Sequence, residues 1–165
     1  MDTLEARGVF YFETPARLRW ELRAPYASIL IHNDGGVAKF NVENGGLRKM
    51  NLAGEDILRT VLGQMMAWMR GDFDAARETY RLDADDAPDG GLRLVLRPRK
   101  EEFARMVGAI ELQLDPATLH VRRVIVREPG NDTVEIRFSN EQSNPTLAPK
   151  LFDLEQPAPP QRRGP

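Results

Sequence analysis

Apolar and polar residues alternate along most of this chain, the pattern of a strand with one dry face and one wet face. The pattern is clearest at residues 17–23, where Leu18, Trp20 and Leu22 alternate with charged residues. The same alternation returns in residues 92–97, 110–114 and 134–138, and in shorter runs at residues 10–13, 28–32 and 38–43. These runs predict a mainly β protein with about nine or ten strands.

Glycine-containing turns separate the predicted strands at short intervals. They occur at residues 33–36, 44–46, 89–91 and 129–132. Glycine and asparagine adopt the positive φ that a tight hairpin needs, so these turns predict an antiparallel meander. Pro15 and Pro25 bracket the strand at residues 17–23, at positions where a missing backbone donor is tolerated.

One segment, residues 55–70, has helical instead of alternating spacing. Its apolar residues are Ile57, Leu58, Val61, Leu62, Met65, Met66, Trp68 and Met69. Glu55 and Asp56 favour the positive end of a helix dipole, and Gly71 suits a left-handed cap. Shorter helical turns are expected at residues 72–79 and 100–106.

A sheet with one apolar face has to bury that face against something. A helix of about 16 residues is roughly 24 Å long, which can plug a curved sheet but cannot cover a flat one. The pattern therefore favours a curved antiparallel half-barrel with a short helical lid over an apolar cavity. Methionines suit a surface that binds varied apolar ligands, although they equally fill ordinary cores. A collapsed β module without a cavity remains an alternative.

Composition excludes several classes of protein. The 165 residues include 23 Lys and Arg against 25 Asp and Glu, a net charge of −2, which disfavours nucleic-acid binding. The chain contains no cysteine and only two histidines, His32 and His120, so we predict no metal site, no cofactor and no catalytic residue. No apolar run reaches the roughly 18 residues of a membrane span. We expect a monomer that is not an enzyme and does not span a membrane.

Several stretches, in this order and spacing, resemble one family. They are Gly8-Val9-Phe10-Tyr11-Phe12-Glu13-Thr14-Pro15-Ala16-Arg17-Leu18-Arg19-Trp20, Ser28-Ile29-Leu30-Ile31-His32-Asn33-Asp34-Gly35, Leu94-Val95-Leu96-Arg97-Pro98, Ile110-Glu111-Leu112 and residues 131–138. Together they cover most of residues 8–152, and the chain resembles the LolA and LolA-like outer-membrane lipoprotein carriers, as a LolA-like paralogue.

The resemblance implies a function and a set of partners. It implies a periplasmic carrier that holds acyl chains in a half-barrel and ferries a lipidated protein, lipid or glycolipid from the inner to the outer membrane. Its partners would be an inner-membrane transporter and an outer-membrane acceptor. A lipid-sensing or protein-interaction domain with the same fold is the alternative.

Compared with the family it resembles, the sequence differs in two ways. Family members have a secretion signal, a first helix and a strand ahead of the segment matching Gly8, so we expect an N-terminally truncated chain. In lipoprotein carriers an arginine before the family's proline latches the lid, and Thr14 stands there in this sequence. Threonine lacks the reach and the five donors of a guanidinium. By alternation with Leu18 and Trp20, we expect Arg17 and Arg19 to face water.

The expected domain is residues 1–155, followed by a disordered Pro-rich tail at residues 156–165. The expected lipid-binding residues are the apolar members of the alternating strands and of the helix. They are Phe10, Phe12, Leu18, Trp20, Leu22, Ile29, Ile31, Phe40, Leu62, Met65, Met66, Met69, Leu94, Leu112, Ile136 and Phe138.

Charged residues give weaker indications of function. The outward strand faces carry many arginines that suit anionic partners, but glutamates are mixed among them, as on ordinary solvated surfaces. His32 is expected to cap a strand before a hairpin. Asp83, Asp85 and Asp86 are expected in a loop, and we assign them no catalytic role.

Overall fold

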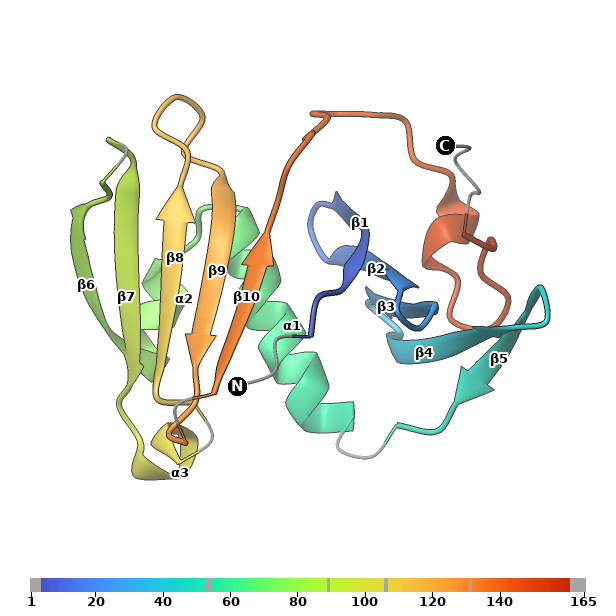
Figure 1. The fold of residues 1–165 in the computed structure, drawn as a ribbon, viewed down its shortest axis with the longest axis horizontal. Helices are drawn as coiled ribbons and strands as arrows, with labels where there is room; N and C mark the ends of the chain where they lie inside the picture. The colour runs from blue at the N-terminus through green and yellow to red at the C-terminus, as the bar shows by residue number, and fades with distance from the viewer. Residues whose placement is uncertain (1–3, 53–54, 89, 106, 131, 161–165) are drawn as a thin grey trace. The chain divides into compact units, whose positions relative to one another are not determined.

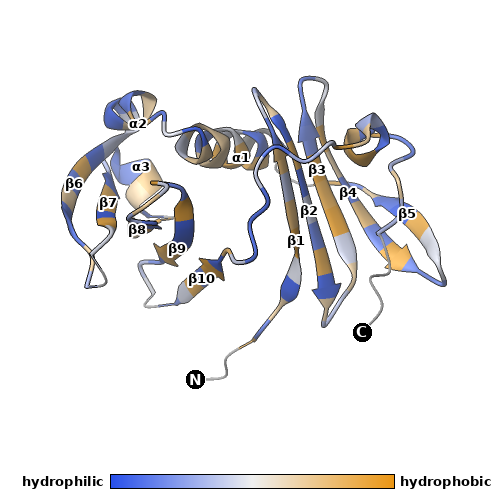
Figure 2. Ribbon diagram, turned by 90° about the horizontal axis from the view of Figure 1, so that it is seen from above, coloured by the Kyte–Doolittle hydropathy of each residue, from blue (hydrophilic) through white to orange (hydrophobic). Residues whose placement is uncertain are grey.

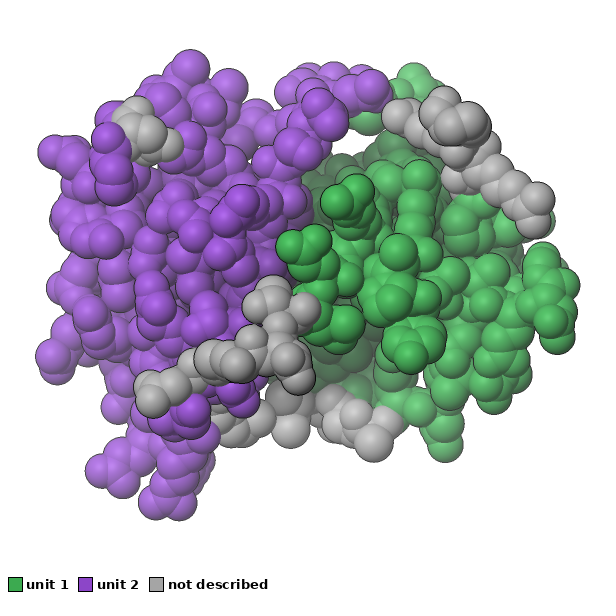
Figure 3. Space-filling view, viewed as in Figure 1, with its two compact units in different colours: residues 1–66, 145–165 green, residues 67–144 purple. Residues whose placement is uncertain are grey.

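The computed structural model describes residues 4–52, 55–88, 90–105, 107–130 and 132–160, and within them it contains ten strands and four short or medium helices (Figure 1). The strands form two five-stranded antiparallel sheets, each an open meander in chain order. The predicted mainly β, antiparallel class is confirmed, with the strands divided between two sheets. The chain divides into two compact units, residues 1–66 with 145–165 and residues 67–144 (Figure 3).

The first unit contains the first sheet and the C-terminal segment. Its elements are β1 (Arg7–Glu13), β2 (Arg17–Ala24), β3 (Ser28–Asn33), β4 (Gly36–Glu43), β5 (Gly46–Met50) and the 3-10 helix η1 (Pro149–Phe152). The loop between β4 and β5 is the residue pair Asn44 and Gly45, with φ of 50° and 80°. The predicted tight Asn-Gly hairpin is thus confirmed, since both loop positions adopt the left-handed region.

The second unit contains the second sheet and two short helices. Its elements are α2 (Asp74–Thr79), β6 (Tyr80–Asp86), β7 (Leu92–Pro98), α3 (Glu101–Ala104), β8 (Ala109–Leu114), β9 (Val121–Arg127) and β10 (Thr133–Arg137). Trp68, Tyr80 and Phe103 form two edge-to-face contacts, with ring centroids 6.1 and 6.0 Å apart. Burial raises the pKa of the Tyr80 hydroxyl to about 12.

The long helix α1 (Glu55–Met69) runs from the first unit into the second, and it confirms the helix predicted at residues 55–70. Gly71 has φ of 75°, and its N–H donates to the carbonyl of Trp68 at 2.9 Å. Glycine reaches this left-handed conformation without a steric cost, which is why the helix ends there. The two shorter predicted helices correspond to α2 and α3; Met106, at the end of the second prediction, lies outside the described residues.

One predicted loop is a strand instead. Asp83, Asp85 and Asp86 lie on β6, where Asp83 and Asp85 pair across the sheet with Val95 and Arg93 of β7. A loop was expected because Pro88, Gly90 and Gly91 follow closely, and three aspartates themselves disfavour a strand. Arginine partners on β7 offset this cost, since Arg93 and Arg97 form ion pairs with Asp85 and Asp83.

Candidate functional site

The register of the first sheet assigns its side chains to two faces, since residues opposite one another in a ladder share a face. Phe12 lies opposite Leu18, and Phe10 lies opposite Trp20. Trp20 in turn lies opposite Leu30 of β3. We call the face that carries these residues the aromatic face; its members are Phe10, Phe12, Leu18, Trp20, Leu22, Leu30 and Val37.

The aromatic face has a buried centre and a partly open aromatic region. Leu18 is fully buried and Val37 is buried, whereas Phe10, Phe12 and Trp20 are half-buried. The rings of Phe10 and Trp20 meet edge to face, with centroids 6.3 Å apart. Half-buried aromatic rings leave apolar surface that an acyl chain can cover.

The opposite face of the first sheet carries three of the predicted lipid-binding residues. Ile29 lies opposite Glu21 and Phe40, and Ile31 lies opposite Arg19 and Ala38. The expectation that Ile29, Ile31 and Phe40 share a face with Leu18 and Trp20 is therefore wrong. Both Leu30 and its neighbours are apolar, so β3 fits either parity, and a one-residue slip exchanges the faces. We call this second face the strap face.

A C-terminal strap, residues 147–158, covers the strap face. Leu151 and Phe152 of η1 are buried in one cluster with Ile29, Ile31, Ala38 and Phe40. Leu147, Leu154 and Ala158 pack against the same cluster. Ile29, Ile31 and Phe40 thus pack against the strap in the core of the first unit. Figure 2 shows the apolar stretches of β3 and β4 by hydropathy.

The strap also corrects the predicted disordered tail. Pro157 is buried, and the N–H of Ala158 donates to the carbonyl of Lys150 at 2.9 Å. Residues 156–158 of the predicted tail therefore belong to the strap, while residues 161–165 lie outside the described residues. Proline and alanine look like linker residues in sequence, but here their small apolar surfaces pack on a sheet.

Arg19 and Glu21 are the largest departure from the alternation rule. Arg19 was expected to face water, and Glu21 shares its position in the alternation, yet Arg19 is 0% exposed and Glu21 is 1% exposed. The Nε of Arg19 donates to the Oε1 of Glu21 at 2.8 Å, and its two terminal nitrogens donate to strap carbonyls. A buried ion pair persists only when such contacts replace lost hydration. Arg17, by contrast, is exposed as predicted and pairs with Glu13 at 2.9 Å.

Thr14 lies in the turn before β2 with an exposed side chain. The two arginines near it have partners elsewhere: Arg17 pairs with Glu13, and Arg19 holds the strap. With these partners, neither arginine takes the place of the family's latch arginine at Thr14.

The apolar side chains of α1 are largely buried. Leu62, Met65, Met66 and Trp68 are 2, 8, 3 and 6% exposed, and Met69 is half-buried. Val61 is 43% exposed, so it marks the outer side of the helix. The side chain of Ile57 lies outside the described part of the chain. The buried stripe fits both of the interpretations that the sequence allowed, a lid face or an ordinary core.

The second sheet follows the alternation rule except at Ile125, which is buried on the face opposite the apolar one. Leu94 and Leu112 lie opposite one another and are buried, and Ile136 lies opposite Val124 on the same face. Phe138, just beyond β10, is half-buried, and its N–H donates to the carbonyl of Arg122 at 2.8 Å. The register therefore brings Leu94, Leu112 and Ile136 together as predicted.

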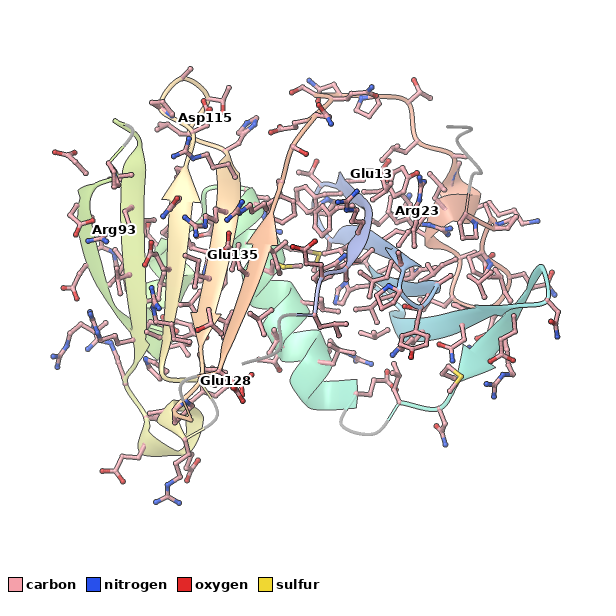
Figure 4. All side chains as sticks on the ribbon, in the orientation of Figure 1. Glu13, Arg23, Arg93, Asp115, Glu128 and Glu135 are labelled. Atoms are coloured by element: carbon pink, nitrogen blue, oxygen red, sulfur yellow. The ribbon has the colours of Figure 1, made fainter. Side chains whose placement is uncertain are left out.

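The other face of the second sheet carries a ladder of ion pairs beside the buried Ile125. Arg93 pairs with Asp85 and Arg97 with Asp83, and Glu135 accepts from both Arg123 and Arg137. Figure 4 labels Arg93 and Glu135 on β7 and β10. Hydrogen bonds from Arg123 and then Arg137 lower the pKa of the Glu135 carboxyl, and a hydrogen bond from Arg93 lowers that of Asp85. These arginines pair with acids of their own sheet, as on a solvated face.

Two groups of residues in these faces were not predicted from the sequence. Leu30 belongs to the aromatic face, and the signal was its place between two other apolar residues on β3. Leu151 and Phe152 of the strap belong to the core. The signal for them was an apolar pair in a polar, Pro-containing stretch. The end of that stretch, from residue 156, was predicted to be a tail.

The sites weighed for other chemistry have structural explanations. His32 is buried, and its Nδ1 lies 3.1 Å from the carbonyl of Ala16, next to the hairpin where a capping role was expected. Among the described residues, no three His, Cys, Asp or Glu side chains gather as a metal-binding group. No described helix has both the length and the apolar character to cross a membrane.

A pocket in the first unit does not suit an acyl chain. Its volume is about 270 Å³, and its lining includes Gly35, Gly36, Lys49, Glu55 and Glu155. Lys49 pairs with Glu155 at 2.5 Å, so the lining is polar and largely self-neutralised. The predicted apolar cavity stays a prediction.

Comparisons with known proteins identify the family. An outer-membrane lipoprotein carrier protein of Methylococcus capsulatus (strain ATCC 33009 / NCIMB 11132 / Bath) is 23% identical over 154 residues, covering 93% of this chain and 69% of the relative. Residues 2–155 match the family described as outer membrane lipoprotein carrier protein LolA, which spans both units and most of the strap. The chain therefore belongs to the LolA family of outer membrane lipoprotein carrier proteins.

Proposed function

We propose that this protein is a periplasmic carrier that binds the acyl chains of a lipoprotein or lipid and ferries them from the inner to the outer membrane. The observation that carries the proposal is the half-buried aromatic face of β1 and β2, in a chain of the lipoprotein-carrier family. Apolar side chains that are neither fully buried nor scattered singly are typical of a surface that takes up apolar ligands.

We assign the cargo to the aromatic face instead of the strap face. Phe10, Phe12 and Trp20 retain accessible apolar surface. Ile29, Ile31 and Phe40, at 0, 0 and 2% exposure, are already covered. An acyl chain gains hydrophobic free energy only from surface that was exposed to water before it bound.

The hydrophobic free energy of burying acyl chains is so large that cargo binding has to displace other contacts of the protein. Two acyl chains of about 14 methylenes each would gross roughly 22 kcal/mol at about 0.8 kcal/mol per methylene, more than noncovalent binding attains. A carrier that held its cargo so tightly would not deliver it. The empty protein must therefore gain contacts of its own that the cargo displaces.

The proposed competitor is the Met-rich face of α1. Leu62, Met65 and Met66 are buried in the structure, and methionine adapts readily to changing apolar partners. In the proposed cycle this face is buried in the empty state and moves away when cargo binds. The cargo arrives from an inner-membrane transporter and leaves to an outer-membrane acceptor.

The first test is native mass spectrometry of protein purified without detergent, followed by organic extraction of anything bound. A lipid or acylated peptide in stoichiometric amount supports the carrier, and its head group distinguishes lipoprotein from glycolipid cargo. Protein that is empty and takes up no fatty-acyl probe contradicts the carrier and favours an interaction domain with the same fold.

The second test separates a lid from an ordinary core. Met65→Glu places a charge on the buried side of α1, and Val61→Glu places the same charge on its exposed side. The lid predicts that Met65→Glu weakens binding of a fatty-acyl probe while Val61→Glu does not. Equal binding by both variants would contradict the lid.

A further inference from the structure

The C-terminal strap is held on the first sheet by polar side chains from three different strands. Arg19 of β2 donates through Nη1 to the carbonyl of Leu151 at 2.9 Å and through Nη2 to that of Ala158 at 2.7 Å. The Nδ2 of Asn33, at the end of β3, donates to the carbonyl of Phe152 at 2.9 Å. Lys49 of β5 pairs with Glu155. These anchors hold the strap from η1 to its C-terminal end.

Arg19 differs from the other anchors because it depends on the strap. Its side chain is 0% exposed, and two of its three described hydrogen bonds go to strap carbonyls. Glu21 Oε1 accepts the third, and Glu21 Oε2 lies 3.5 Å from Nη2 of Arg23. A buried guanidinium that loses such partners is strongly destabilised until water reaches it. Arg19 can therefore stay buried while the strap is bound to the sheet, and detachment of the strap would expose Arg19 to water.

Loss of the strap would expose a second apolar surface. Ile29, Ile31, Ala38 and Phe40 form one cluster with Leu151 and Phe152 of the strap, and Tyr11, Val42 and Leu47 of the first sheet pack against it. Bare, this cluster would offer acyl chains a surface comparable to the aromatic face, on the opposite side of the same strands. A carrier with two competing apolar faces would bind its cargo in more than one way.

We propose that Arg19 is a positioning residue for cargo specificity: it fastens the strap over one face of the first sheet and so confines acyl chains to the aromatic face. This inference rests on the proposed carrier function for its cargo, but the fastening itself does not. Glu21 orients the guanidinium toward the strap through its 2.8 Å contact with Nε. The fold thus uses one buried ion pair to close one of two apolar surfaces.

The first arm of the experiment measures the strap by hydrogen exchange of the full chain. Arg19→Met keeps the length of the side chain and removes its donors. We expect amide exchange in the strap to become about 100-fold faster, while the amides of β3 and β4 stay protected. Arg17→Met is the matched control, because Arg17 lies two residues away on the same strand and is exposed. Unchanged strap exchange in Arg19→Met would overturn the fastener.

The second arm maps where a diazirine-labelled fatty acid cross-links to the protein. In the unaltered chain we expect labels on the aromatic face, and in Arg19→Met additional labels at Ile29, Ile31 or Phe40. Leu18→Ala is a core truncation on the aromatic face, the side of β2 opposite the strap and the Arg19 side chain. It should not open the strap face, which separates lost fastening from general loss of stability.

A double variant, Leu151→Ala with Phe152→Ala, protects the test against misfolding of Arg19→Met. It loosens the strap from its own side and leaves Arg19 and Glu21 in place. It should produce the same additional labels. A strap that exchanges faster in either variant without new labels on the strap face would overturn the confinement of cargo. If the unaltered chain takes up no probe, the carrier function is contradicted. The hydrogen-exchange result would still test whether Arg19 holds the strap on the sheet.

Discussion

The two sheets of this protein solve the same burial problem in different ways. The second sheet has one apolar face, around Leu94 and Leu112, and one face of cross-strand ion pairs on which Ile125 is the buried apolar residue. The first sheet is apolar on both faces, and it carries a buried ion pair on the face that the C-terminal strap covers. The comparison teaches that an alternating charged position is exposed only where no other part of the chain returns to cover it.

The largest effect should come from removing the buried charge. Arg19→Met removes the nearer of the two cations beside the buried Glu21, leaving Arg23 at 3.5 Å, and frees two strap carbonyls, so we expect the free energy of unfolding to fall by about 3–5 kcal/mol. Arg97→Met removes a guanidinium from the exposed ladder of the second sheet, and its effect should be several-fold smaller. Urea unfolding measures both: Trp20 fluorescence in a Trp68→Phe background follows the first unit for Arg19→Met, and Trp68 fluorescence in a Trp20→Phe background follows the second unit for Arg97→Met.

A companion variant sharpens this comparison. Arg19→Met combined with Glu21→Leu removes both charges, and most of the lost stability should return, because no unpaired charge remains buried. If Arg19→Met costs no more than Arg97→Met, the two sheets do not differ in the way described.

A smaller effect, confined to the second unit, should appear at alkaline pH. Burial raises the pKa of Tyr80 to about 12, above the roughly 10 of an unfolded tyrosine. The folded state therefore favours the neutral hydroxyl; its contribution is fully present below pH 10 and is lost as the pH rises toward 12. The loss should reach about 2–3 kcal/mol.

Tyr80→Phe is the control for this prediction, because it keeps the ring between Trp68 and Phe103 and removes the titrating group. Its unfolding should lack this alkaline loss in urea titrations followed by Trp68 fluorescence in a Trp20→Phe background. The Phe10–Trp20 contact of the first unit carries no titratable group. Parallel alkaline curves for the unaltered chain and the Tyr80→Phe variant would contradict the assignment.

The smallest effect should come from the exposed ladder. Asp85→Asn removes the acid partner of Arg93, and we expect a slight decrease in the urea midpoint that disappears at about 1 M salt, where screening acts within a few ångströms. Because the pKa of Asp85 is lowered by its hydrogen bond from Arg93, the contribution is present at neutral pH and is lost as the pH falls through the carboxyl's titration range. A salt-independent effect would indicate packing instead of charge.

The sequence predicted much of the fold for physical reasons that operate locally. The Asn44-Gly45 hairpin, the end of α1 at Gly71 and the apolar face of the second sheet each depend on neighbouring residues or on strict alternation. These are the signals that a single sequence carries well.

The rest depended on contacts between residues far apart in the chain. Arg19 lies 132 residues before Leu151, whose carbonyl it binds, and no local pattern announces that contact. β3 is apolar at Ile29, Leu30 and Ile31, so alternation does not show which of its side chains share a face with Trp20. The pairing of Trp20 with Leu30 in the structure shows that Leu30 does. The candidate site was therefore predictable in residue type but not in which face each residue occupies.

The most direct measurement of the central claim is cross-linking of a diazirine-labelled fatty acid to the unaltered full chain, with the labelled residues mapped by mass spectrometry. We predict labels on Phe10, Phe12 and Trp20 of the aromatic face and none on Ile29, Ile31 and Phe40 beneath the strap. Labelling of the strap face at the same level as the aromatic face would contradict the claim that the strap reserves one surface of the first sheet for cargo.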